Sequence, residues 1–362
     1  MKYPVYQPKI GELEKAYVNE CLDSTWISSK GKFIDLFESA FAEKFGVKHA
    51  IAVSNGTVAL HAAFVAAGIG PGDEVIVPTF TYIASVNAIT YTGAKPIFVD
   101  SEEASLLLDP AKLETAITNK TKAILAVHLY GDICDMGEIL RIAHKHSILV
   151  IEDCAESLGS KLKGRHSGTF GKMATFSFFG NKTLTTGEGG MITTNDDELA
   201  SVCRRVKGQG LATGREYWHD IIGYNYRMTN ICAAIGYAQL QSFDQVVSRK
   251  QEIAARYFKQ LQGTDIILPR ATKDVTNSYW MVNVMLQKAE EREPLRTYLR
   301  ELGIETRPSF YPVHQMPMYD QGLTFVCAED ISGRGINLPS YPELSDSDID
   351  FICDSIKSYF NH

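Results

Sequence analysis

The chain has 362 residues, of which 45% are hydrophobic and 22% charged, and its formal net charge is −7. A chain of this length and composition can bury a large core and is too long for one ordinary domain. The acidic balance excludes a general nucleic-acid-binding surface, which is usually basic. No run of about 18 or more apolar residues is present, so we expect no membrane span.

The seven cysteines occur singly, and none forms a Cys-x-x-Cys pair. An odd count without such pairs favours reduced thiols over a disulfide framework or a zinc site. The first residues lack the apolar stretch of a signal peptide. We therefore expect a cytoplasmic protein without a metal site.

Short apolar runs alternate with helical patterns through the first half of the chain. The pattern predicts strands at 50–53, 74–77, 96–99, 123–129 and 148–151, and helices over 57–67, from 83 onward, near 110–117 and over 136–146. Such alternation of helices with short, nearly all-apolar strands indicates an α/β fold with a largely parallel sheet.

Two further apolar runs follow closely, at 174–179 and 191–194. The segment between them is too short for a helical crossover of the usual length. At least one of these two strands is therefore expected to be antiparallel or non-adjacent.

The last third of the chain has the patterns of a second, smaller unit. A long helical pattern over about 229–261 leads to a predicted strand at 279–286 and predicted helices over 290–302 and 346–359. We therefore expect a large domain over residues 1–243 and a small C-terminal α+β domain over residues 244–362.

Ligands of open α/β sheets bind beyond the carboxyl ends of the strands, so the residues that follow each strand are the first candidates for chemistry. Ser54-Asn55-Gly56-Thr57 follows the first strand and opens a helix, whose free N–H groups and dipole suit a phosphate. The alternative interpretation is an ordinary helix cap, because Asn and Ser are common at that position.

Asp153 and Lys182 both follow predicted strands. A carboxylate at the edge of the sheet can pair with a protonated ring nitrogen of a cofactor, or it can cap the helix that comes next. Lys182 stands between an aromatic run and a glycine-rich turn at 187–190. Desolvation would make this lysine a nucleophilic amine, whereas most lysines are solvated surface residues.

Several longer motifs occur in a fixed order along the chain. They are Ser-Asn-Gly-Thr (54–57), Pro-Thr-Phe-Thr-Tyr (78–82), Glu-Asp-Cys-Ala-Glu (152–156), Ser-Phe-Phe-Gly-Asn-Lys (177–182), Gly-Glu-Gly-Gly (187–190) and Gly-Tyr-Asn-Tyr-Arg-Met-Thr (223–229). In this combination the chain resembles the DegT/DnrJ/EryC1/StrS family of sugar aminotransferases, from about residue 8 to the C-terminus. Segments 23–31 and 305–314 resemble the family members that aminate GDP-4-keto-6-deoxymannose at C4.

The resemblance implies the aspartate-aminotransferase fold (fold type I), with a homodimer whose active sites are shared at the interface. It also implies a pyridoxal 5′-phosphate (PLP) cofactor that cycles through pyridoxamine 5′-phosphate. The substrates would be L-glutamate and a GDP-linked 4-keto-6-deoxy sugar, and the product would serve O-antigen or other lipopolysaccharide biosynthesis.

The same resemblance assigns roles to individual residues. Lys182 would hold the cofactor covalently and move the proton, while Asp153 would pair with the pyridine nitrogen. The other implied cofactor contacts are Gly56, Thr57 and Ser177 at the phosphate, Asn225 at the phosphate of the neighbouring subunit, Tyr82 stacked on the ring, and Glu156 near the ring hydroxyl. The expected substrate groove is lined by Trp26, Ser28, Arg307, Tyr311 and His314.

Some of these assignments have a structural alternative. Tyr82 would pack in the core, Ser177 would be an ordinary strand hydroxyl, Asn225 a turn residue, and His314 a structural hydrogen-bond donor. Glu156 departs from the Gln or His that many family members carry at this position, although it fits the pattern of the members that aminate the GDP-linked sugar.

Alternative functions predict other residues at some of these positions. An NAD-linked oxidoreductase needs Gly-x-Gly-x-x-Gly after the first strand, where this chain has Asn55-Gly56-Thr57. Relatives that act as 3-dehydratases carry His in place of Lys182, so the lysine favours transamination. An aminotransferase for another nucleotide-linked keto sugar and a non-catalytic PLP-binding regulator remain as alternatives.

Overall fold

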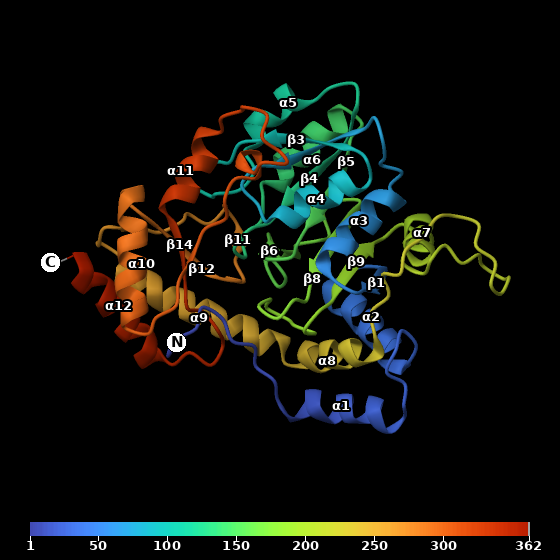
Figure 1. Ribbon diagram of the computed structural model, residues 1–362, viewed down its shortest axis with the longest axis horizontal. Coiled ribbons are helices and arrows are strands. Elements are labelled where there is room, and N and C mark those ends of the chain that lie inside the picture. Colours follow the sequence, from blue (N-terminus) through green and yellow to red (C-terminus); the bar gives the residue numbers. More distant parts are fainter. Residues whose placement is uncertain (361–362) are drawn as a thin grey trace.

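The computed structural model describes residues 1–360, and its larger part is built on a seven-stranded sheet (Figure 1). The strand order is β1-β9-β8-β5-β4-β2-β3. The strands are β1 (His49–Val53), β2 (Glu74–Pro78), β3 (Lys95–Val99), β4 (Thr121–Val127), β5 (Leu149–Asp153), β8 (Met173–Ser177) and β9 (Gly190–Thr194). The middle strands pair in parallel, and β9 runs antiparallel to both β1 and β8. The mainly parallel sheet is thus confirmed, and so is an antiparallel strand among the two closely spaced runs.

Helices cover this sheet, so most residues of the strands are buried on both faces. This is why the strands are nearly continuous apolar runs in the sequence. The covering helices include α2 (Lys32–Phe45) against β1, α3 (Gly56–Ala66) against β8 and β9, α4 (Ile83–Tyr91) against β2 and β3, α6 (Met136–Lys145) against β5, and α7 (Asp197–Lys207) against β1 and β9. A short helix, α5 (Leu113–Ala116), packs near β3.

The single helix expected over about 229–261 is in fact two helices, α8 (Asn230–Gln241) and α9 (Phe243–Leu261), interrupted at Ser242. They lie end to end in Figure 1 but pack against different neighbours. α8 is covered by α1 (Glu12–Asp23) and α2, whereas α9 packs against α12 (Asp346–Phe360). Each helix therefore packs its apolar face against its own layer, and the helical run is interrupted at Ser242.

The smaller part is a four-stranded antiparallel sheet with helices around it. Its strands are β10 (Ile266–Ile267), β12 (Val282–Leu286), β14 (Gly335–Leu338) and β13 (Arg307–Pro308), and its other helices are α10 (Arg292–Glu301) and α11 (Val326–Arg334). A third sheet joins β11 (Val275–Thr276), β6 (Lys161–Leu162) and β7 (Arg165–His166). The expected domain boundary falls at the start of α9 and stays a prediction. Within residues 1–360, no helix has the length and apolar character needed to cross a membrane.

The first residues of the chain form a strap across the small domain, which we call the N-terminal strap (residues 3–6). Tyr3 forms a parallel bridge with Ile304, and the Val5 N–H donates to the Glu305 carboxylate over 2.9 Å. The Val5 carbonyl in turn accepts the N–H of Ser340 at 3.2 Å. These bonds fix Tyr6 between the small domain and the central sheet.

Candidate active site

Lys182 lies in the loop that leaves β8, and its side chain is only 13% exposed. Its Nζ lies 3.7 Å from Oε1 of Glu156, a residue that follows β5 and is itself buried. Burial lowers the pKa of the Lys182 amine, although the nearby Glu156 and Asp153 carboxylates oppose this shift. Burial also raises the pKa of Glu156 to about 7. Both shifts act in the direction that lets the amine lose its proton and the carboxyl group retain one.

Asp153 is the last residue of β5 and is 5% exposed. Its Oδ2 accepts a hydrogen bond of 2.8 Å from the Ser85 hydroxyl, and its Oδ1 accepts the N–H of Ala155 at 3.1 Å. Turns rather than a helix follow Asp153, so the alternative role as a helix cap does not apply. The structure thus holds a buried carboxylate at the carboxyl edge of the sheet, close enough to Lys182 to affect its pKa.

The start of α3 packs tightly against the end of β8. A Cβ on Gly56 would lie only 2.7 Å from the Cβ of Ser177, so a larger residue does not fit there. Asn55 does cap the helix, because its side chain accepts the N–H of Val58 at 3.0 Å. Cap and anion site are compatible here: the first N–H groups of the helix, at Gly56 and Thr57, lie beside the Ser177 hydroxyl and suit a phosphate.

A row of aromatic rings borders this group. Tyr82 is 58% exposed, and its ring centroid lies 5.8 Å from that of Phe310. Phe310 stacks on Tyr130 at 5.9 Å, and Tyr130 stacks on Trp280 at 6.2 Å. Phe310 and Trp280 belong to the C-terminal third of the chain, so the site lies where the central sheet meets the small domain. The exposed ring of Tyr82 is not core packing and is free to contact a planar ligand.

These residues fit PLP in their chemistry. The cofactor needs an amine that can be unprotonated, a carboxylate for its ring nitrogen, N–H donors for its phosphate and a flat apolar face for its ring. Lys182, Asp153, the start of α3 and Tyr82 supply these four features along the carboxyl edge of the central sheet. The close packing of Gly56 on Ser177 is the observation that most directly indicates the phosphate end.

Asn225 is not joined to this group within one chain. Its backbone bridges to Gly208, and its side-chain oxygen accepts a hydrogen bond of 3.2 Å from Arg227. It lies at the base of the segment between α7 and α8, where the Tyr226 carbonyl accepts the N–H of Ser54 at 2.8 Å and Arg227 bridges to Val53. Among residues 1–360, the hydrogen bond of its side-chain amide is the one to Arg227 and none leads to Lys182, so the expected phosphate contact from a second subunit stays a prediction.

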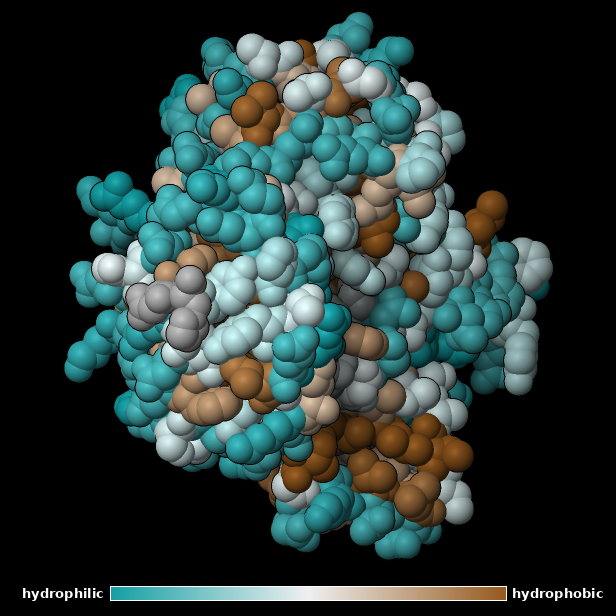
Figure 2. All heavy atoms as spheres, turned by 60° about the vertical axis from the view of Figure 1, so that its left-hand side comes forward, coloured by the Kyte–Doolittle hydropathy of each residue, from teal (hydrophilic) through white to brown (hydrophobic). Residues whose placement is uncertain are grey.

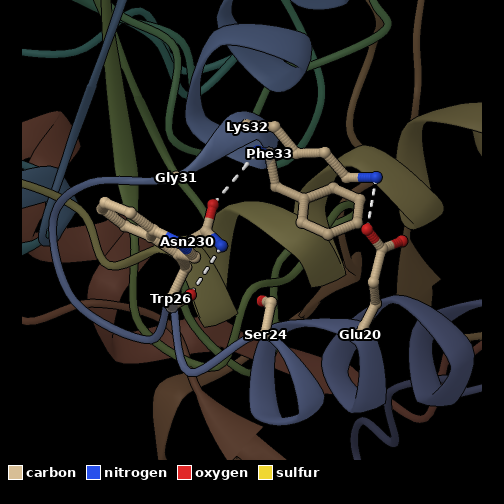
Figure 3. A pocket seen from close by; sticks show the side chains of 7 residues that line it. All are labelled: Glu20, Ser24, Trp26, Gly31, Lys32, Phe33 and Asn230. Atoms are coloured by element: carbon tan, nitrogen blue, oxygen red, sulfur yellow. Dashed lines mark hydrogen bonds and ion pairs between the residues drawn. The ribbon is translucent and has the colours of Figure 1, made fainter.

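Trp26 and Ser28 also lie apart from Lys182, in the loop between α1 and α2. Trp26 helps to line a pocket of about 390 Å³ at the end of α1, which Figure 3 shows from close by. The amide of Asn230 fixes this loop, because it donates to the Trp26 carbonyl at 2.7 Å and accepts the Phe33 N–H at 3.0 Å. The lining residues are Glu20, Ser24, Trp26, Gly31, Lys32, Phe33 and Asn230, and none of them belongs to the Lys182 group.

Two of the expected groove residues are exposed on the small domain. Arg307 pairs with Glu305 at 3.3 Å, and its side chain is 49% exposed. Tyr311 is 54% exposed and follows Phe310 of the aromatic row. Both side chains are available to a ligand that extends outward from the buried site.

The expectation for His314 needs correction. Its side chain is 2% exposed, and both ring nitrogens already have partners: Nδ1 meets the Thr79 hydroxyl at 2.7 Å, and Nε2 meets the Glu329 carboxylate at 3.1 Å. A histidine held in this way has no free nitrogen for a nucleotide. His314 therefore takes its alternative role, a structural link between the end of β2 and α11.

A buried cluster beneath the site has the residue types of a metal centre: His128, Glu152 and Cys154. Glu152, however, meets His128 Nε2 at 3.0 Å and accepts backbone N–H groups from Gly168, Phe170 and Gly171. The cluster is thus explained as a hydrogen-bond network that anchors β5 just before Asp153.

Comparison with known proteins now identifies the chain. Residues 8–357 match the family model described as the DegT/DnrJ/EryC1/StrS aminotransferase family. The chain belongs to this family. The expected family, the α/β fold class and the class of PLP-dependent aminotransferase are therefore confirmed.

Individual members of the DegT/DnrJ/EryC1/StrS family match over the whole chain. A GDP-perosamine synthase from Escherichia coli O157:H7 is 59% identical over 363 aligned residues, covering 100% of both chains. Among solved structures, the aminotransferase TlmJ from Streptoalloteichus hindustanus superposes with a TM-score of 0.95 at 30% identity, covering 99% of both chains. The PLP form of Spr1654 from Streptococcus pneumoniae gives a TM-score of 0.94 at 29% identity, covering 99% of this chain and 98% of that one.

Proposed function

We propose that this chain transfers the amino group of L-glutamate to C4 of GDP-4-keto-6-deoxymannose and so makes GDP-perosamine for polysaccharide biosynthesis. The observation that carries the proposal is the 59% identity, over the full length of both chains, to a GDP-perosamine synthase. The buried amine of Lys182 supports full transamination rather than dehydration. The seven free cysteines support the cytoplasm, where the nucleotide-linked sugar would be found, as the place of the reaction.

Named residues would hold the cofactor. The Lys182 amine would bond its aldehyde carbon, Asp153 would accept a hydrogen bond from its ring nitrogen, and Tyr82 would cover its ring. The N–H groups of Gly56 and Thr57 and the hydroxyl of Ser177 would hold its phosphate. When bound, PLP supplies a charged ring that accepts the electron pair left after a proton leaves the neighbouring carbon.

Residues of the chain itself carry out the proton transfers and hold the charges of the site. In the first half-reaction, Lys182 Nζ takes the proton from Cα of L-glutamate. In the second, it delivers a proton to C4 of the sugar. Glu156 receives or supplies a proton at Oε1, 3.7 Å from that amine, so Lys182 can be restored to its neutral form. Asp153, held by Ser85, keeps a negative charge at the far end of the site. The same lysine serves both half-reactions, which predicts ping-pong kinetics.

We also propose that two copies of the chain share their active sites. Figure 2 shows hydrophobic side chains gathered at the lower end of the molecule, where Figure 1 places α1 and α8. Exposed apolar residues of this region and of the segment between α7 and α8 include Ile10, Leu13, Leu22, Trp26, Ile27, Leu211, Tyr217, Trp218 and Ile222. Surfaces of this kind are typical of protein interfaces. In a dimer, Asn225 would reach the phosphate of the partner's cofactor.

The outer part of the substrate would follow the exposed residues. Arg307 would pair with the diphosphate, because a guanidinium binds phosphate oxygens in a bidentate manner. Tyr311 would border the same path. Trp26 and Ser28, on their separate loop, would contribute to the nucleotide site only if the second subunit brings them close to it.

Product analysis with purified protein tests the function. The chain is incubated with PLP, L-glutamate and, in separate reactions, GDP-4-keto-6-deoxymannose and the corresponding UDP- and dTDP-linked 4-keto sugars. With the GDP-linked sugar only, we expect an amino sugar of the expected mass and 2-oxoglutarate in large excess over the enzyme; Lys182→Ala should give neither product. Faster amination of another nucleotide sugar would overturn the substrate. The absence of 2-oxoglutarate in every reaction would overturn amino transfer itself and favour a regulator.

A further inference from the structure

The peptide groups on both sides of the Lys182 side chain are held by aromatic residues from distant parts of the chain. The indole N–H of Trp280 donates to the Asn181 carbonyl at 2.8 Å. The hydroxyl of Tyr6 donates to the carbonyl of Lys182 itself at 2.7 Å. Trp280 precedes β12 of the small domain, and Tyr6 belongs to the N-terminal strap. The loop that carries Lys182 is thus held by two donors that lie 176 and 99 positions away from their acceptors in the chain.

Trp280 also contacts the amine directly. The Nζ of Lys182 lies 3.9 Å from the centroid of the Trp280 ring, and Trp280 is only 4% exposed. An aromatic face attracts a cation and excludes water from it. Because Glu156 lies 3.7 Å from the same amine, Nζ is held between a ring face and a carboxylate. The stacking of Trp280 on Tyr130 keeps that ring in place.

Tyr6 is also fixed by contacts on both sides. The strap bonds on its N-terminal side lead to Glu305 and Ser340 of the small domain. The ring of Tyr6 packs near the buried Lys250, whose Nζ lies 5.1 Å from the ring centroid and donates to the Ser340 carbonyl at 2.7 Å. Burial raises the pKa of Tyr6, so its hydroxyl stays protonated and remains a donor.

We propose that Trp280 and Tyr6 are positioning residues for Lys182: Trp280 holds the amine with its ring face, and both residues hold the backbone of the loop between β8 and β9 (residues 178–189), which we call the lysine loop. The reactive lysine is therefore completed by the small domain and the N-terminal strap. This inference deepens the proposed function and rests on it for the role of Lys182. The geometry it invokes, however, is tested without the cofactor or any sugar.

The first experiment separates the two contacts of Trp280. In cofactor-free protein, the apparent pKa of Lys182 is measured from the pH dependence of its acetylation by acetic anhydride, followed by peptide mass spectrometry. Trp280→Leu removes the ring face, and we expect the pKa to fall by about one unit. Trp280→Phe retains a ring face, and we expect it to restore at least half of this shift. A pKa that is unchanged or raised in Trp280→Leu would overturn the role of the ring.

The second experiment tests the hold on the backbone. Hydrogen exchange of the segment 179–186 is compared in cofactor-free wild type, Tyr6→Phe and Trp280→Phe. Each variant loses one donor, so we expect exchange about three- to tenfold faster in both. Tyr298→Phe is the matched control, because Tyr298 packs on Tyr359 in the small domain. Exchange no faster in Tyr6→Phe and Trp280→Phe than in this control would overturn the proposal for the loop.

Kinetics then connect the geometry to the reaction. In the active wild-type enzyme, Trp280→Leu and Tyr6→Phe should lower kcat of both half-reactions about tenfold and leave KM for the sugar nearly unchanged, because they act through Lys182. If the wild type transaminates and these kcat values do not fall, the inference fails and the proposed function stands. If the wild type does not transaminate, the proposed function fails, and the pKa and exchange results still decide whether the two residues position Lys182.

Discussion

The hydroxyl of Ser85 donates a hydrogen bond of 2.8 Å to Oδ2 of Asp153 and so links the first turn of α4 to the end of β5. The serine is 2% exposed, and its oxygen lies 3.1 Å from the Thr81 hydroxyl. Asp153 therefore accepts one bond from its own turn, through Ala155, and one from a neighbouring layer. The direction of the carboxylate depends on both.

Ser85→Ala should lower kcat about tenfold, since a hydrogen bond to a charged group contributes about 1.5–3 kcal/mol and only part of this would be lost in the transition state. The measurement is steady-state kinetics with L-glutamate and the preferred sugar. Ser355→Ala is the control, because Ser355 is another nearly buried serine that bonds a backbone carbonyl of its own helix. Equal kcat values for the two variants would show that Ser85 does not orient Asp153.

Replacement of Lys182 should abolish the reaction rather than slow it. Lys182→Ala removes the amine, and Lys182→Arg retains the charge but cannot bond an aldehyde or release a proton near neutral pH. We expect no turnover and no visible absorbance from a lysine-linked cofactor in either variant. Lys163→Ala, at an exposed position beside Asp274, should behave as wild type. Measurable turnover by Lys182→Ala would refute the assignment.

Glu156 predicts a specific dependence of stability on pH. Burial raises the pKa of Glu156 to about 7 from its ordinary value of 4.5. The folded chain therefore retains a proton that the unfolded chain releases, and this stabilisation is complete below about pH 4.5 and lost as the pH rises through about 7. Glu156→Gln has no such proton to lose.

In urea unfolding of cofactor-free protein, Glu156→Gln should gain up to about 3 kcal/mol relative to wild type between pH 5 and pH 7.5. Glu343→Gln replaces an exposed carboxylate and should follow the wild-type curve. The same pH dependence in Glu156→Gln and wild type would mean that this carboxyl group is not the source of the effect.

Complementation tests the shared active site. Lys182→Ala and Asn225→Ala are expected to be inactive or strongly impaired when each is measured alone. After the two are mixed and allowed to exchange subunits, half of the dimers would be mixed, and each would have one intact site. Activity should then recover to about a quarter of the wild-type value. No recovery after proven exchange would place Lys182 and Asn225 in the same site of one subunit.

Much of the central sheet was predictable because its strands are buried on both faces and stand out as apolar runs. Predicted and observed strand bounds differ by one or two residues, as at β1 and β3. The break at Ser242 carries no Gly or Pro signal, because it arises from the different neighbours of α8 and α9. No prediction covers helices α1, α2, α7 and α11, because they lie outside the strand–helix alternation of residues 49–151.

The site was predictable where a residue follows a strand and belongs to a family motif, as for Asp153 and Lys182. Ser85, Trp280 and Tyr6 were missed because their roles depend on contacts between segments far apart in the chain. Tyr6 and Lys182 are separated by 176 positions, and Trp280 and Asn181 by 99. The only local signal is their type, since a buried Trp or Tyr usually needs a partner for its polar group.

The N-terminal strap has a consequence for how the protein is made. The N–H of Val5 is bonded to Glu305, which stands 300 positions later in the chain, and the carbonyl partner of Val5 is Ser340. During synthesis, Tyr6 therefore has no fixed place until residue 340 has been added. The loop around Lys182 can therefore take its final shape only after residue 340 has been synthesised, and a chain cut short before that residue would lack one of the strap bonds that fix Tyr6 against the Lys182 carbonyl.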